Sequence, residues 1–159
     1  ILTADKIPVD GFDSNQVIDK EIEVQQQKFR MTCVSMGNPH CVVFVDDAEK
    51  FPVEHFGTHF EHHNLFPKKI NTEFVQIIDR QNIRMRVWER GAAVTLACGT
   101  GACATVTACV LNNLTEQNVK VNLPGGSVFI EWQGSGENPD KNIFMTGPAN
   151  YSFFADYLL

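Results

Sequence analysis

The feature that most constrains this fold is a stretch without a single charged residue, residues 101–114, which is rich in Ala, Thr and Val. A helix at a protein surface carries polar residues along one side, so a helix that is apolar nearly all round is buried. A chain of 159 residues forms one domain with one core by default. The sequence therefore predicts a central helix enclosed by the other elements.

Most of the remaining chain consists of β-rich runs joined by short turns. A second helix, residues 48–63, is expected after Asp46 and Asp47, which offer N-cap chemistry. Strands are expected within residues 32–46, with a turn at 36–39, and over residues 71–79, 83–89, 119–123, 127–133, 143–146 and 151–157. Short turns favour antiparallel pairing. We therefore predict an α+β domain in which a mostly antiparallel sheet wraps around a buried helix.

Charge and hydropathy exclude two classes of partner. The 13 basic and 19 acidic residues give a net charge of −6 at pH 7, and Lys68 and Lys69 are the only adjacent basic pair. Without a basic stripe, nucleic-acid binding is not expected. No apolar run approaches the roughly 18 to 20 residues that span a bilayer, so no membrane partner is expected either.

The five cysteines are an odd set without a C-x-x-C pair, which argues against a disulfide framework or a zinc ribbon. Free thiols and the absence of a visible signal peptide favour the cytoplasm. The cluster of His55, His59, His62 and His63 is a weak metal signal, because helix spacing alone brings few other ligands to it. We expect no metal site.

The stretch from Trp88 to Ala104 carries the clearest chemistry. A strand ends at Glu89 and Arg90, a loop of small residues follows, and Cys98 comes just before the buried helix. The first N–H groups of a helix carry partial positive charge. They would lower the pKa of Cys98 below its usual value of about 8.5 and could bind a substrate carboxylate. The alternative is that Cys98 is a small buried residue in a tight turn.

The other four cysteines fall in strands or inside the apolar helix, and we interpret them as core residues: Cys33, Cys41, Cys103 and Cys109. Cys103 is five residues from Cys98 in the same helix, so it cannot reach the opposite side of a substrate bound at Cys98.

Several ordered blocks from about residue 31 to the C-terminus resemble the diaminopimelate epimerase family, whose members are pyridoxal-independent amino-acid epimerases. The blocks are Val-Ser-Met-Gly-Asn-Pro-His at 34–40, Phe-Gly at 56–57, Glu-His-His at 61–63, Phe-Pro at 66–67, Asn-Thr-Glu-Phe-Val at 71–75, Trp-Glu-Arg-Gly at 88–91, Ala-Cys-Gly-Thr-Gly-Ala-Cys-Ala at 97–104, Pro-Gly-Gly at 124–126 and Met-Thr-Gly-Pro at 145–148.

This resemblance implies that residues 1–159 form a single domain, the C-terminal half of a pseudo-symmetric two-domain enzyme. The N-terminal half, with its own Cys-Gly-Asn-Gly block, is absent. The expected substrate is diaminopimelate, interconverted between its L,L and meso forms without a cofactor. Epimerisation at Cα needs one group to remove a proton and another to deliver one from the opposite face. The missing half is therefore an expected partner, the isolated chain is expected to be inactive, and the resemblance leaves a homodimer open.

The resemblance also assigns roles to individual positions. Cys98 resembles the thiol that donates the proton in the L,L to meso direction. Positions that support catalysis in the family correspond to His40 and Glu89. The backbone that binds the substrate carboxylate corresponds to Gly99 and Thr100. The positions that contact the substrate correspond to Asn38, Asn71, Glu89 and Arg90. Such groups suit a zwitterion, which needs a carboxylate for its ammonium and donors for its carboxylate. From the residues alone, Asn38 is also a common turn residue, Asn71 a strand-start cap, and Glu89 with Arg90 a surface pair.

One departure lies in the loop before Cys98. The family usually carries a Gly followed by a Glu where this chain has Ala93 and Val94.

Two other functions remain open from the sequence. The chain could belong to another cofactor-free isomerase of the same superfamily, such as the phenazine-synthesis or proline-racemase type. It could also be a non-catalytic domain that retains the fold.

Overall fold

The computed structural model describes residues 1–12, 15–151 and 153–157. In chain order its elements are η1 (Ala4–Lys6), β1 (Lys20–Val24), β2 (Gln27–Ser35), β3 (Pro39–Phe44), α1 (Val53–Glu61), β4 (Asn71–Asp79), β5 (Asn82–Glu89), β6 (Ala93–Thr95), α2 (Gly99–Leu111), β7 (Asn118–Leu123), β8 (Gly126–Trp132) and β9 (Ile143–Thr146). Within the described ranges no helix is long and apolar enough to cross a membrane.

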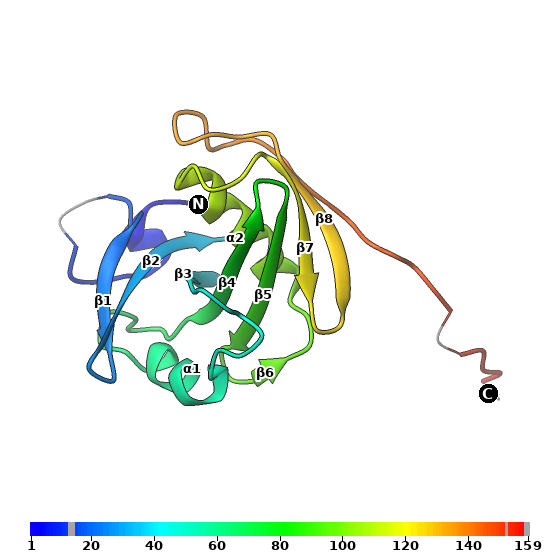
Figure 1. Ribbon diagram of the computed structural model, residues 1–159, viewed down its shortest axis with the longest axis horizontal. Helices are drawn as coiled ribbons and strands as arrows, with labels where there is room; N and C mark the ends of the chain where they lie inside the picture. The colour runs from blue at the N-terminus through cyan, green and yellow to red at the C-terminus, as the bar shows by residue number, and fades with distance from the viewer. Residues whose placement is uncertain (13–14, 152, 158–159) are drawn as a thin grey trace.

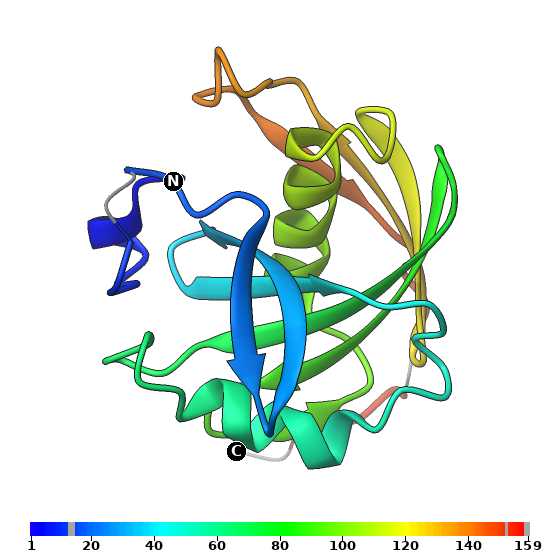
Figure 2. The same ribbon diagram turned by 60° about the vertical axis from the view of Figure 1, so that its left-hand side comes forward.

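The strands form one curled sheet in the order β1-β2-β3-β4-β5-β7-β8-β9, with β6 paired to β5 outside this path. Neighbouring strands are antiparallel except at β3–β4 and β5–β7, which are parallel. Figures 1 and 2 show the sheet bending around α2, with α1 at its lower edge. The predicted α+β class and the mostly antiparallel sheet are confirmed.

Helix α2 is the enclosed helix that the sequence predicts. Residues 104–109 are buried without interruption, and α2 contacts β2, β3, β4, β7, β8 and β9. It begins two residues earlier than expected because Cys98 adopts an extended backbone and caps it. It ends at Leu111, where Asn112 donates its side-chain amide to the carbonyl of Ala108 at 2.7 Å.

Helix α1 is shorter than the predicted 48–63. Its N-cap is Pro52, and a proline disfavours helical backbone at the residue before it. Asp47 still acts as a cap, but of a separate turn: its Oδ1 accepts from the N–H groups of Glu49 and Lys50 at 3.0 and 3.1 Å. The expected N-cap chemistry is therefore present without the helix that it was expected to start.

The central strands bury side chains on both faces of the sheet. Phe74 of β4 packs with α1 and the first strands, whereas its neighbour Val75 packs with α2 and the later strands. In the same way Val43 of β3 faces the first cluster and Val42 the second. Alternate residues share a face, so Asn71 and Glu73 lie on the α2 side of β4. This places polar side chains beneath the helix that Cys98 caps.

The predicted strand at 151–157 is wrong for the residues that the structure describes, and Ser152 lies outside them. Tyr151 and residues 153–157 have no regular structure, and Figure 1 shows this segment leaving the body after β9. No neighbouring strand offers its backbone a partner, and a strand forms only in a sheet. The sequence also missed β1, whose Lys20, Glu21 and Glu23 hide its β pattern.

Gly57 of α1 provides a test of how tightly this helix packs. A Cβ added at Gly57 would lie 2.5 Å from the Trp88 ring, which is fixed by the bond from its Nε1 to Glu61 Oε2 at 2.7 Å. We expect Gly57→Ala to lower the free energy of unfolding by about 1–3 kcal/mol through overpacking, despite the better helix propensity of Ala. Urea denaturation measures the change. The neighbouring substitution Thr58→Ala is the control and should leave stability unchanged or slightly raised; equal stability of both variants would contradict the packing.

Candidate active site

Cys98 stands at the N-terminus of α2, as the sequence predicts. Its Sγ accepts a hydrogen bond from the Gly101 N–H at 3.3 Å and lies 3.5 Å from Thr100 Oγ1. The thiol borders a hollow of about 620 Å³, whose lining includes Met36, Glu89, Thr100, Cys103 and Met145. Glu89, Gly99 and Thr100 thus border the same hollow as Cys98.

The predicted pKa of Cys98 is wrong in direction. Burial raises the pKa of the thiol above its usual value, and the hydrogen bonds from Thr100 and Gly101 lower it only in part. The negative charges of Glu73 and Glu89 raise it further. Only 8% of Cys98 is exposed, so loss of solvation outweighs the partial charge of the helix N-terminus. The thiol form is therefore favoured at neutral pH.

A continuous series of polar contacts connects Cys98 to the buried pair of His40 and Glu73. Asn38 Nδ2 donates to Thr100 Oγ1 at 3.3 Å, and Asn38 Oδ1 lies 3.0 Å from His40 Nε2. On its other side His40 Nδ1 lies 2.7 Å from Glu73 Oε1. Asn38 reaches this place from a turn in which Gly37 has a φ of +102°, a left-handed conformation that favours glycine.

Two other predicted site residues form a second group. Asn71 is buried; its Nδ2 donates to the Pro39 carbonyl at 2.7 Å and its Oδ1 accepts from the Arg90 N–H at 2.9 Å. The Arg90 guanidinium donates to the Lys68 carbonyl at 2.9 Å. Asn71 therefore connects the backbone that carries His40 with the backbone after Glu89. In this structure both groups of its amide serve the protein itself.

The loop that leads to Cys98 is anchored by a buried carboxylate of α1. Glu61 accepts from the Trp88 indole and from the Gly91 N–H, at 2.7 and 3.2 Å. Glu89 accepts a short hydrogen bond from Thr95 Oγ1 across the same loop. The departure at Val94 is accounted for, because its side chain packs against the core cluster around α1.

The remaining thiols differ from one another. All five cysteines are free. Cys33, Cys41 and Cys109 are buried, as predicted, and burial raises the pKa of Cys109 to about 12. Cys103 is not a pure core residue: it is half-buried and borders the hollow beside Cys98. Among the residues that the structure describes, no group of three His, Cys, Asp or Glu side chains could hold a metal ion.

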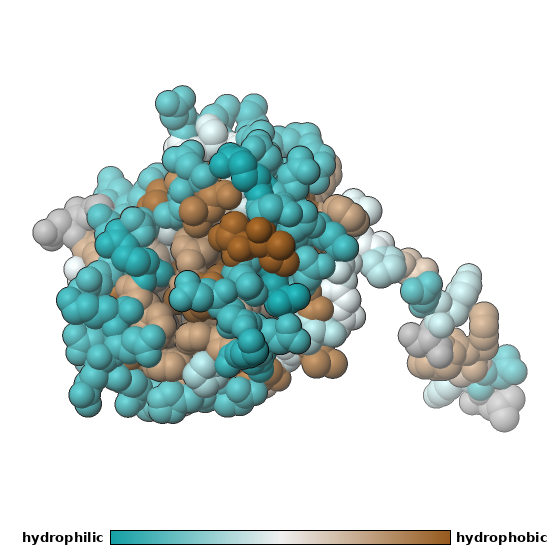
Figure 3. All heavy atoms as spheres, in the orientation of Figure 1, coloured by the Kyte–Doolittle hydropathy of each residue, from teal (hydrophilic) through white to brown (hydrophobic). Residues whose placement is uncertain are grey.

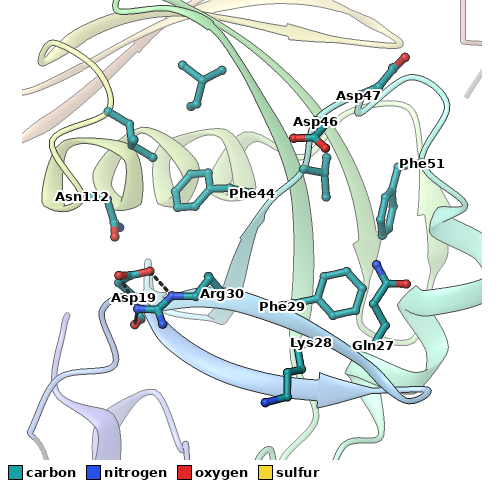
Figure 4. A pocket seen from close by; sticks show the side chains of 13 residues that line it. Asp19, Gln27, Lys28, Phe29, Arg30, Phe44, Asp46, Asp47, Phe51 and Asn112 are labelled. Carbon is teal, nitrogen blue, oxygen red and sulfur yellow. Dashed lines mark hydrogen bonds and ion pairs between the residues drawn. The ribbon is translucent and has the colours of Figure 1, made fainter.

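A larger hollow of about 770 Å³ lies away from this chemistry. It is bordered by Asn112, the C-cap of α2, and by the exposed ion pair of Arg30 with Asp19, as Figure 4 shows. Cys98 caps the opposite end of α2, about 20 Å away at 1.5 Å per residue. No thiol borders this hollow, so it is not the candidate active site.

Comparison with known proteins agrees with this geometry. Residues 32–152 match the model of the family described as diaminopimelate epimerase. The chain belongs to the diaminopimelate epimerase family. It is 52% identical to the diaminopimelate epimerase of Agathobacter rectalis and 49% identical to diaminopimelate epimerase 1 of a Nostoc species, each match covering 96% of this chain. These matches cover 54% and 53% of those proteins, so the chain spans about half the length of its epimerase relatives.

A solved structure supports the fold as well. A phenazine biosynthesis protein of the PhzF family from Bacillus anthracis is similar over 79% of this chain and 40% of its own, with a TM-score of 0.51 and 23% identity. At this identity the likeness concerns the fold alone. The much higher identity to the epimerases separates this chain from the phenazine-type alternative.

Sequence reasoning missed two features of the site. Met36, Ile143 and Met145 border the hollow with Cys98, and Glu73 lies fully buried behind His40. The first set comes from distant segments that only the fold brings together. Glu73 had a signal, because a charged residue next to Phe74 and Val75 in the β-rich run 71–79 has to be paired when the strand is central.

Ala93, where the family usually carries glycine, adopts a φ of +62°. A side chain in this left-handed region is strained by roughly 1–2 kcal/mol. We expect Ala93→Gly to raise the free energy of unfolding by about 1 kcal/mol, measured by urea denaturation. The matched control is Ala92→Gly at the neighbouring exposed position, whose φ is not positive; it should lower stability by about 0.5 kcal/mol. Equal effects of both substitutions would refute the strain at Ala93.

The reactivity of Cys98 follows from its raised pKa. Because the thiolate is the nucleophile, alkylation of Cys98 should still accelerate as the pH rises past about 8.5. Cys98 should react before Cys103, since only Cys98 has hydrogen-bond donors for its thiolate, whereas Cys33, Cys41 and Cys109 should stay unmodified while the chain is folded. Timed iodoacetamide labelling with peptide mapping measures this order. A rate that levels off below neutral pH, or earlier modification of Cys103, would contradict the site geometry.

Proposed function

We propose that this chain supplies one of the two proton-transferring thiols of a cofactor-independent epimerase that interconverts L,L- and meso-diaminopimelate. The observation that carries the proposal is the position of Cys98, at the N-terminus of α2 and on the border of a hollow with Glu89, Gly99 and Thr100. The names of the epimerase relatives support the substrate and the reaction.

In this proposal Cys98 delivers a proton to Cα as a thiol or removes one as a thiolate. A second base on the opposite face of Cα does the reverse, so that one proton is lost and one is gained. The raised pKa of Cys98 suits the delivering direction, because the residue keeps its proton at neutral pH. This agrees with the predicted role of Cys98 in the L,L to meso direction.

The charged groups of the substrate have matching partners at the hollow. The N–H groups of Gly99 and Thr100 are in the first turn of α2, where N–H groups have no intrahelical partner, and they suit the substrate carboxylate. The Glu89 carboxylate suits the ammonium group. Asn38 is half-buried beside Thr100 and can contribute an amide. Asn71 and Arg90 are proposed to hold the backbone of this site in register as well as to contact substrate.

The partner that completes the site is an N-terminal half like that of the longer relatives. Apolar side chains are exposed at and near the hollow: Met145, which borders it, is 53% exposed, and Leu96, two residues before Cys98, is 68% exposed. Aromatic residues of the C-terminal segment, such as Tyr151 and Phe154, are also exposed, and Figure 3 shows apolar side chains there away from the body. Exposed apolar surface of this extent marks an interface.

The five free thiols favour the cytoplasm, and a homodimer stays a prediction.

The half-site gives a direct functional test. The isolated chain should fold but should not exchange the Cα proton of diaminopimelate, because Cys98 reaches only one face of the carbon. Joining it to the N-terminal half of a relative should restore interconversion of the L,L and meso forms with solvent deuterium uptake at Cα, without added pyridoxal phosphate or metal. Cys98→Ala in the joined protein should then lower kcat by at least about 1000-fold, the scale of losing an essential proton donor.

The matched control is Cys103→Ala, which alters a thiol of the same hollow that the mechanism does not use. It should retain most of the activity, apart from a small loss through packing. Turnover by the isolated chain, after removal of host epimerase, would contradict the two-thiol account. An inactive joined protein with an intact fold would favour a non-catalytic domain.

A further inference from the structure

Glu73 is the buried charge for which the mechanism above has no use. It lies on β4 with no exposed surface, and its Oε2 has no hydrogen-bond partner within the described part of the chain. A buried carboxylate with an unpartnered oxygen costs stability, and an apolar residue of similar size would avoid that cost. Packing alone therefore does not explain why a glutamate occupies this position.

Among the described residues, the side chain of Glu73 forms a hydrogen bond with His40, which is also fully buried. Glu73 Oε1 lies 2.7 Å from His40 Nδ1, and the far side of the ring leads through Asn38 and Thr100 to the thiol of Cys98, with successive separations of 3.0, 3.3 and 3.5 Å. Glu73 is the innermost member of this series. It has no exposed surface with which to touch a substrate, whereas Thr100 and Cys98, the outer members, border the hollow.

The first turn of α2 packs directly against the Glu73 carboxylate. A Cβ added at Gly101 would lie 2.8 Å from Glu73 Oε1 and 3.2 Å from Cys98 Sγ. Glycine therefore leaves the space in which the carboxylate and the thiol approach the same turn. The partial positive charge at a helix N-terminus favours a carboxylate there.

The contacts of His40 determine where its protons lie. Asn38 Nδ2 donates to Thr100, so Asn38 Oδ1 is the group that faces His40 Nε2. Two acceptors repel each other, and Nε2 therefore carries a proton. The 2.7 Å separation of His40 Nδ1 and Glu73 Oε1 requires a proton between these two atoms as well, because two acceptors would repel each other. Burial raises the pKa of the Glu73 carboxyl, which favours its protonated form, and the charge and hydrogen bond of His40 offset this only in part.

We propose that Glu73 is a positioning residue: it holds His40 with a proton on Nε2, and through Asn38 and Thr100 it orients the thiol of Cys98. When Glu73 donates the shared proton to Nδ1, Nδ1 is the acceptor and the proton of the neutral ring stays on Nε2. Without Glu73, Nδ1 can take the proton of the neutral ring. Nε2 would then face the Asn38 oxygen without a proton, and Asn38 would turn away from Thr100. This role rests on the proposed function for its catalytic effect but not for its effect on His40.

The test uses the protein completed with its N-terminal half, with Glu73→Met as the main variant, because Met has a similar volume and no hydrogen-bonding group. Histidine 15N spectra, with the His40 signals assigned from His40→Gln, report the tautomer. We expect Nε2–H in the unmodified protein and a mixture of both tautomers in Glu73→Met. The urea midpoint should change little, because replacing a buried charge by an apolar residue is often neutral. kcat should fall by about 10- to 100-fold with little change in KM, as for other residues that act through a histidine.

Glu73→Gln is the conservative variant and decides the question if Glu73→Met does not fold. An amide can present either its oxygen or its NH2 group to Nδ1, so both tautomers should again appear, with a fall in kcat of about 10-fold. Glu61→Gln is the matched control: it changes the other buried glutamate among the described residues and should leave the His40 tautomer unchanged.

An unchanged tautomer in both Glu73 variants would overturn the proposal, as would a changed tautomer with full kcat. If the unmodified protein has no epimerase activity, the proposed function fails instead, and the His40 spectra alone decide the role of Glu73.

Discussion

The structure depends on the burial of a helix that has no charged residue. Every side of α2 has to be covered, and a flat sheet covers only one side, so the sheet curls until β2, β3, β4, β7, β8 and β9 all contact the helix. The ends of such a helix are the only places where its backbone remains polar. Cys98 caps one of them. The position of Cys98, and with it the candidate active site, is therefore fixed by the packing of this apolar helix.

The parallel pairing of β3 with β4 places the polar side chains beneath that end. In this register His40 lies beside Asn71, and Glu73 follows two residues later on the same face. The turn before β3 then brings Asn38 to Thr100. Residues that are 33 and 62 positions apart in the chain thus form one series of contacts because two strands meet in one register.

Sequence patterns predicted those features of the fold that depend on neighbouring residues in the chain. The apolar composition of α2 and the β-rich pattern of β4 were sufficient to predict where these two elements lie in the chain. The start of α1 was predicted wrongly, because Pro52 outweighs the capping by Asp47. The segment after β9 has β-forming residues but no neighbouring strand. For Cys98 the local rule, a helix N-terminus that lowers a thiol pKa, gave the wrong direction, because burial and two carboxylates come from distant parts of the chain. The partner of Glu73 likewise comes from a distant strand, because His40 is 33 residues away in the chain.

Three features that oppose stability lie around this site. The buried His40–Glu73 pair lies beneath the first turn of α2, and left-handed Ala93 and exposed Leu96 lie in the segment that leads to Cys98. The core clusters on the two faces of the sheet contain apolar side chains instead. Local conflicts of this kind persist where a function or a missing interface requires them. Each has a different physical origin, and all three lie at or next to the end of α2 that Cys98 caps. This is the end that the proposed function assigns to the substrate and to the second half of the enzyme.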